Sequence, residues 1–124
     1  MYSIRSNTFE NRLLIILKGK IELDEANQIS DKIIKSVKSL MPGYTVITDI
    51  QEMAPAMEDA RQVFLTTMQA MKNAGLGLEV RVINPQNQVT ANQFQRTSRA
   101  AGYTAQEVNS VSEAERLIDQ LMTA

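Results

Sequence analysis

The stretch YTVITDIQEMAPAMED, residues 44–59, decides the fold, because it passes from an apolar segment through a proline-containing loop into an acidic one. The run from 44 to 50 is rich in β-branched side chains, which favours an interior strand. Glu58 and Asp59 favour a helix start, since carboxylates complement the positive end of the helix dipole. In a mainly parallel sheet, ligands and partners are usually bound by the loop after a strand's carboxyl end. We therefore expect the working surface at this loop.

The segments on both sides of this stretch alternate between strand and helix patterns. Apolar residues spaced by three or four predict helices, and short β-rich runs predict strands. Thr90 and Gln93 have the spacing of a capping box that opens the third helix. The expected strands are 2–6, 12–21, 44–50, 78–83 and 105–111, and the expected helices are 23–40, 58–74, 90–102 and 112–121. The order ββαβαβαβα predicts a single α/β domain over residues 1–124, with a mixed, mainly parallel sheet of about five strands and about four helices.

The strand expected at 78–83 has an unusual pattern for a parallel sheet. Leu78, Val80 and Val82 alternate with Glu79 and Arg81. A strand covered on both faces normally reads as continuously apolar, so the alternation predicts that one side of this strand faces solvent. Right-handed crossovers between strands added in one direction place their helices on the same side. We therefore expect the helices largely on one face of the sheet.

Composition excludes several classes of function. The 124 residues contain no cysteine and no histidine, which rules out disulfides, cysteine nucleophiles, Ser-His-Asp catalysis and ordinary zinc sites. The net charge is −1, from 13 basic and 14 acidic residues, without a basic block that could follow a phosphate backbone. The longest aliphatic run, residues 13–17, is far too short to span a membrane. We expect a cytoplasmic protein with no cofactor, no metal and no nucleic-acid partner.

The element order, together with four local strings, resembles the STAS domain, the fold named for sulfate transporters and anti-sigma factor antagonists. The strings are LKGKIELDEA at 17–26, TDI at 48–50, VINPQNQV at 82–89 and RAAGYTAQEVNSVSEAERLI at 99–118. The resemblance covers nearly the whole chain. It implies a STAS-like α/β scaffold that works by binding other molecules.

One position departs from the pattern of this family. Anti-sigma factor antagonists carry an acceptor serine where the loop after the middle strand turns into a helix, and here the comparable positions read Met57-Glu58-Asp59-Ala60. The nearest hydroxyls, on Thr66 and Thr67, are about two turns farther along the helix. The resemblance therefore implies the scaffold without its usual phosphorylation switch. A carboxylate at Glu58 or Asp59 would partly imitate a fixed negative charge.

Polar and flexible side chains after two neighbouring strands form the candidate binding surface. Methionines in a polar loop suit adaptable partner or lipid surfaces, although one or two could instead fill the core. Carboxylates gathered at one loop could also hold Mg²⁺ or Ca²⁺, although their spacing matches no established loop. The residues expected to contact a partner or ligand are Asp49, Gln51, Glu52, Met53, Met57, Glu58, Asp59, Asn84, Gln86 and Asn87.

The function expected from these residues is that of a non-enzymatic binding module with a protein partner and no catalytic residues. Three alternatives stay open. The helices could enclose a cavity for a small apolar molecule or lipid, which would make the protein a carrier. The carboxylates could act with Mg²⁺ in an enzyme. The module itself could be a monomer or a homodimer.

Overall fold

The computed structural model describes residues 1–123, with side chains through residue 122. The elements are β1 (Tyr2–Asn7), β2 (Arg12–Gly19), α1 (Leu23–Val37), β3 (Thr45–Met53), α2 (Glu58–Asn73), β4 (Leu78–Val82), α3 (Gln88–Ala101), β5 (Gln106–Val108) and α4 (Val111–Thr123). This order confirms the ββαβαβαβα prediction. The predicted domain also includes residue 124, which lies outside the described residues. None of the helices in the described chain is both long and apolar enough to cross a membrane.

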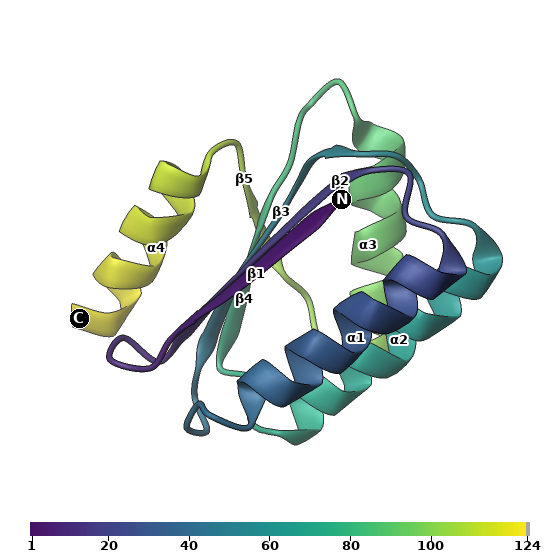
Figure 1. The fold of residues 1–124 in the computed structure, drawn as a ribbon. Coiled ribbons are helices and arrows are strands. Elements are labelled where there is room, and N and C mark those ends of the chain that lie inside the picture. The colour runs from purple at the N-terminus through teal and green to yellow at the C-terminus, as the bar shows by residue number, and fades with distance from the viewer. Residues whose placement is uncertain (124) are drawn as a thin grey trace.

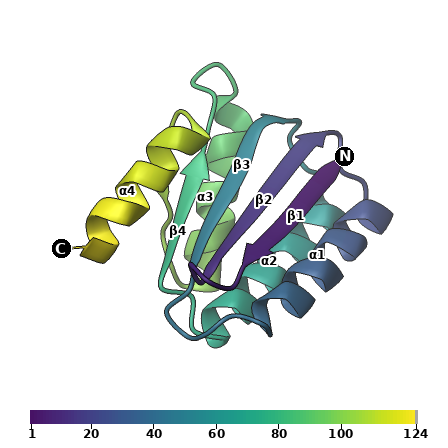
Figure 2. The same ribbon diagram turned by 60° about the vertical axis from the view of Figure 1, so that its left-hand side comes forward.

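The five strands form one sheet in the order β1-β2-β3-β4-β5, so strands that follow each other in the sequence are neighbours. Figure 2 shows β1 to β4 side by side. β1 pairs antiparallel with β2, and the other pairs are parallel. The mixed, mainly parallel sheet predicted from the sequence is therefore confirmed. Because β2 to β5 run in one direction, the loops after their carboxyl ends lie along the same edge of the sheet.

Helices α1, α2 and α3 cover one face of the sheet, and α4 lies on the other (Figure 1). The first three connect successive parallel strands, so right-handed crossovers place them on the same side, as the sequence predicted. Helix α4 follows the last strand, where no crossover constrains it. Its Ala114 and Ile118 pack with Ile47, Val80 and Val82 in a second, smaller core.

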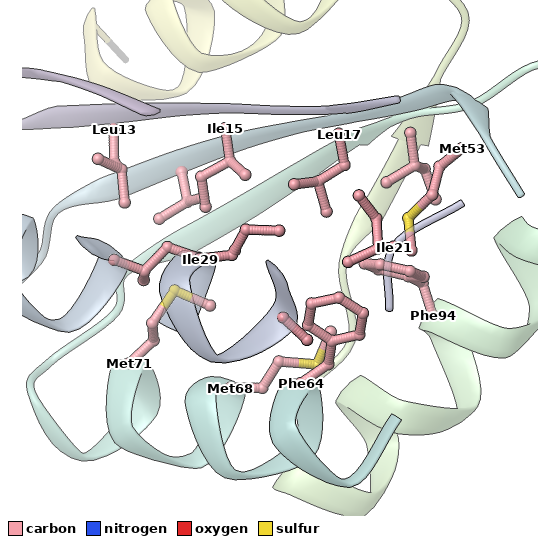
Figure 3. Close-up of a cluster of buried hydrophobic side chains, with 14 of the residues drawn as sticks. Leu13, Ile15, Leu17, Ile21, Ile29, Met53, Phe64, Met68, Met71 and Phe94 are labelled. Atoms are coloured by element: carbon pink, nitrogen blue, oxygen red, sulfur yellow. The ribbon is translucent and has the colours of Figure 1, made fainter. Parts of the chain in front are cut away.

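The main core lies between the sheet and helices α1 to α3. Leu13, Ile15 and Leu17 alternate along β2 and face this helical layer, where Phe64 and Phe94 have ring centroids 5.6 Å apart (Figure 3). This alternation explains why one side of β2 is continuously buried. The core fixes the strand ends and therefore the positions of the loops that follow them.

Strand β4 is buried on both faces, so the prediction of a solvent-facing side is wrong. Glu79 and Arg81 are 2% and 0% exposed. They face α3 as an ion pair, with Arg81 Nη2 2.9 Å and Nε 3.2 Å from Glu79 Oε2. The Tyr103 hydroxyl donates to Glu79 Oε1 at 2.6 Å, and Arg81 Nη1 lies 3.4 Å from Ser98 Oγ. We call Glu79, Arg81, Ser98 and Tyr103 the buried charge cluster.

Candidate functional site

Two loops meet at the edge where the parallel strands end. The register between β2 and β3 pairs Gly19 with Met53, the last residues of the two strands. Beyond this pair, the amide of Ala54 donates to the Gly19 carbonyl at 3.0 Å. The β2–α1 loop and the β3–α2 loop are therefore joined by the backbone and present their side chains together.

A surface depression of about 340 Å³ lies between these loops. Its lining residues, which we call the rim surface, are Lys20, Glu22, Leu23, Met57, Glu58 and Asp59. Leu23 is 39% exposed and Met57 is 64% exposed. The depression thus offers two apolar side chains surrounded by charged groups.

The charged groups of the rim surface are mostly satisfied within the protein. Lys20 Nζ is 3.5 Å from Glu22 Oε1, and Glu58 Oε2 is 2.9 Å from Arg61 Nη1. Asp59 Oδ1 accepts a hydrogen bond from the amide of Ala60 at 2.7 Å. Exposed pairs of this kind contribute only about 0–1 kcal/mol to stability, so a partner could displace them at little cost. One lysine against three carboxylates gives the rim surface a formal charge of −2.

Helix α3 holds the β3–α2 loop from behind. The Met53 carbonyl accepts hydrogen bonds from Asn87 Nδ2 at 2.8 Å and from the Thr90 hydroxyl at 2.9 Å. The Gln93 amide binds Ala56 twice, since its Oε1 accepts from the Ala56 amide at 2.8 Å and its Nε2 donates to the Ala56 carbonyl at 2.9 Å. The conformation of the loop before Met57 is therefore fixed by side chains of another element.

The predicted capping box at Thr90 and Gln93 is wrong. Helix α3 begins at Gln88, with Asn87 at the N-cap position, so Thr90 and Gln93 lie inside the helix. Both side chains are buried and bind the neighbouring loop, and the Thr90 hydroxyl also lies 3.1 Å from Oδ1 of Asn87 at the N-cap. Their spacing matched the motif, but their polar groups serve a tertiary contact.

Met53 does not belong to the exposed surface on which we expected it. Its side chain is 1% exposed and packs in the main core (Figure 3). The reason is a register shift, because Ile16 pairs with Asp49 whereas Lys18 pairs with Glu52. The extra residue of β3 in this bulge reverses the alternation, and Met53 points toward the helical layer.

The other predicted residues do not all lie at the rim surface. Met57, Glu58 and Asp59 meet at the rim surface. Asp49 pairs in register with Val82, which belongs to the core under α4, so it lies on the opposite face of the sheet.

Gln51 and Glu52 both make side-chain contacts within the sheet. The amide and the side-chain Nε2 of Gln51 both donate to Asp49 Oδ1 at 3.1 Å, and Glu52 Oε2 is 3.3 Å from Lys18 Nζ. Within residues 1–122, no three His, Cys, Asp or Glu side chains are grouped so that they could hold a metal ion.

The residues after β4 contribute to a turn and to the support of the loop. Asn84 Oδ1 accepts a hydrogen bond from the Gln86 amide at 3.0 Å, which closes a local turn. Asn87 binds the Met53 carbonyl, as described above, and of the three predicted residues after β4 Gln86 is the exposed one. Contact of these residues with a partner stays a prediction.

Half of the rim surface was not among the residues expected from the sequence. Lys20, Glu22 and Leu23 follow β2 as Met57 follows β3, and they come together because β2 and β3 are parallel neighbours. The signal was present in the segment 17–26, which carries part of the STAS resemblance. This segment could be assigned to the site only once the order of the strands in the sheet was known.

Replacing Gln93 by methionine is expected to loosen the β3–α2 loop. The change removes both hydrogen bonds to Ala56 and leaves the backbone amide and carbonyl of Ala56 without a side-chain partner. The expected loss in the free energy of unfolding is about 1–3 kcal/mol. Exchange of the backbone amide hydrogens of Ala54, Ala56 and Met57 should become at least about tenfold faster. The matched control is Gln88→Met, in an exposed position of the same helix. Equal exchange in the two variants would show that Gln93 does not hold the loop.

Comparison with solved structures places the fold. The chain is similar to the structure of the anti-sigma factor antagonist SpoIIAA in its unphosphorylated form, with a TM-score of 0.67, 16% identity and 100% coverage of both chains. It is also similar to the Bacillus cell fate determinant SpoIIAA in the phosphorylated form, with a TM-score of 0.61, 16% identity, and coverage of 94% of this chain and 99% of the other. No family model and no curated protein matches the sequence. These similarities confirm the predicted STAS-like fold.

Proposed function

We propose that the protein is a non-enzymatic binding module that recognises a protein partner through the rim surface. The observation that carries this proposal is the exposure of Leu23 and Met57 in one depression at the strand-end edge of the sheet. Single exposed apolar residues are normal on protein surfaces. Two of them lining one depression, with charged residues around them, have the arrangement of a small interface with an apolar centre and a polar rim.

The charge of the rim surface indicates the chemistry of the partner. Three carboxylates surround Met57 and Leu23, with one lysine. Complementary charges steer association and select between partners. The partner that fits best presents an apolar side chain flanked by lysine or arginine.

Structural similarity to an anti-sigma factor antagonist supports a regulatory role. The similar structures are described in phosphorylated and unphosphorylated forms. In this chain the first turn of α2 begins Glu58-Asp59-Ala60 and has no hydroxyl. We infer that binding here is not controlled by phosphorylation at that position, since the carboxylates supply a constant negative charge instead.

The size of the internal cavity favours a binding module over a lipid carrier. The space between the sheet and the helices, lined by side chains such as Leu17, Phe64 and Met68, is about 20 Å³. A cavity of this size holds about one water molecule. An acyl chain would require the core to open.

The test is protein capture from cell extract with a double variant, Leu23→Asp and Met57→Asp. Aspartate is favoured at an N-cap position such as that of Met57, so the change should not weaken α2. Proteins retained by the wild type are expected to be lost, because the apolar centre becomes charged. The matched control is Met41→Asp, which alters a methionine of similar exposure outside the rim surface and should retain them.

Two results would contradict the proposal. An identical set of captured proteins for the wild type and the double variant would remove the rim surface as the binding site. Native mass spectrometry of freshly purified protein that showed a retained lipid would favour the carrier.

The cytoplasmic location is a further prediction, which fractionation of cells that express the protein would check.

A further inference from the structure

The second face of the sheet is only partly covered. Helix α4 packs over β3, β4 and β5, and β1 and β2 lie beside it without a helix on this face (Figure 2). A groove of about 470 Å³ lies here, lined by residues of the β1–β2 hairpin and by Glu115 of α4. Leu14 and Ile47 are its apolar lining residues in the sheet.

The two walls of the groove carry opposite charges without partners. Arg5 lies on β1 and Glu115 lies on α4, and both are exposed. Within residues 1–122, neither side chain has an ion-pair or hydrogen-bond partner. In contrast, Arg12 is already paired, with Nη1 3.2 Å from Glu10 Oε2 and Nη2 2.9 Å from Asp119 Oδ1.

One of the side chains that line the groove is an exposed aromatic ring. Phe9, in the turn of the hairpin, lines the groove and is 98% exposed. Burial of a phenylalanine side chain is worth about 1.5–3 kcal/mol. A benzene molecule fits in a cavity of about 150 Å³, so the groove is large enough for a phenyl ring and its neighbours.

We propose that this groove is the interface of a symmetric homodimer. A two-fold axis through the groove exchanges its walls, so that Arg5 of each copy meets Glu115 of the other. The same axis brings each Phe9 into contact with the groove of the other copy. Such self-complementarity is what an isologous interface requires, and a second copy satisfies both unpaired charges at once.

The proposed dimer leaves the rim surface accessible. The hairpin precedes β2 at Arg12, whereas the rim surface follows β2 after Gly19, at the opposite end of the strand. A specific interface of standard size buries about 800 Å² of each partner, roughly an eighth of the 6742 Å² surface of this chain. Each dimer therefore carries two free rim surfaces, and the inference does not depend on the function proposed for them.

The test is sedimentation equilibrium of the wild type and of charge-reversed variants. Arg5→Glu alone and Glu115→Arg alone should each weaken the dimer at least about tenfold, because like charges then face each other twice. The double variant Arg5→Glu/Glu115→Arg should restore the wild-type affinity, since the pair is rebuilt with its signs exchanged. A wild type that is monomeric at its highest soluble concentration would overturn the proposal. So would a double variant that is no tighter than the single variants.

A second substitution tests the aromatic contact. Phe9→Ser should also weaken the dimer, and Val89→Ser, an exposed apolar position on α3, should not. Thermal unfolding followed by circular dichroism confirms that each variant is folded. Equal dimerisation of the two serine variants would contradict the insertion of Phe9 into the groove of a second copy.

Discussion

Replacing Arg81 by methionine is expected to lower the free energy of unfolding by about 3–5 kcal/mol. Methionine fills part of the volume of the side chain but leaves the Glu79 carboxylate buried without its cation. That carboxylate has few alternatives, since Glu79 is 2% exposed and, within residues 1–122, its only hydrogen bond besides those from Arg81 comes from Tyr103. Urea unfolding followed by circular dichroism measures the loss. If the free energy of unfolding also depended less steeply on urea concentration, the native state itself would have become less compact.

Two further variants show whether the loss comes from the unpaired charge. The double variant Glu79→Gln/Arg81→Met removes both charges and keeps an oxygen that accepts the Tyr103 hydroxyl, so it should recover most of the stability. Lys18→Met is the matched control, because it breaks an exposed ion pair, with Glu52, and should cost at most about 1 kcal/mol. A loss for Arg81→Met no greater than for Lys18→Met would show that the buried charge cluster contributes little.

The same residues show where prediction from the sequence failed. An alternation of apolar and charged residues usually means that one face of a strand meets water. In β4 the charged residues neutralise each other, and Ser98 and Tyr103 complete their hydrogen bonds from distant parts of the chain. A buried pair and an exposed face have the same local pattern. Only the packing of α3 distinguishes them.

Local rules were sufficient to place three of the candidate residues within the fold, and their role in binding stays a prediction. Met57, Glu58 and Asp59 could be placed at a helix start after a strand because acidic first turns and strand composition are local signals. Met53 could not be placed, since the bulge opposite Ile16 and Lys18 shifts the alternation within one strand. Residues 20–23 reach the same depression because β2 pairs with β3, and this long-range pairing cannot be predicted from a local sequence pattern.

Alkaline pH is expected to destabilise the protein through two tyrosines, one buried and one partly buried. Burial, followed by the negative charge of Glu79, raises the pKa of Tyr44 to about 12. Burial, the charge of Glu79 and the hydrogen bond to it raise the pKa of Tyr103 further above its usual value. In the unfolded chain both hydroxyls ionise near pH 10.

The sign of the effect follows from which state holds the protons. Below pH 10 both states keep them, and the full stability is present. Above pH 10 the unfolded chain loses both protons while the folded protein retains them. The unfolded state is therefore stabilised relative to the folded state. The unfolding equilibrium constant should therefore rise with pH by up to about tenfold per unit for each tyrosine, or about a hundredfold for the two together, until Tyr44 itself ionises near pH 12. Urea unfolding midpoints measured between pH 9 and 12 give this slope.

Differences between variants isolate the contribution of a single tyrosine to this slope. Tyr103→Phe removes one of the two ionising groups, so its stability should fall only about half as steeply on a logarithmic scale. Tyr2→Phe is the matched control, since it removes a hydroxyl outside the buried charge cluster, 3.4 Å from Gln28 Oε1, and a change in slope for Tyr103→Phe alone assigns the effect to Tyr103. A Tyr103→Phe slope equal to that of the wild type would mean that the folded protein releases this proton as readily as the unfolded chain. The buried charge cluster would then have to be open to water at high pH, and the Arg81→Met loss measured near neutrality would be expected to disappear there as well.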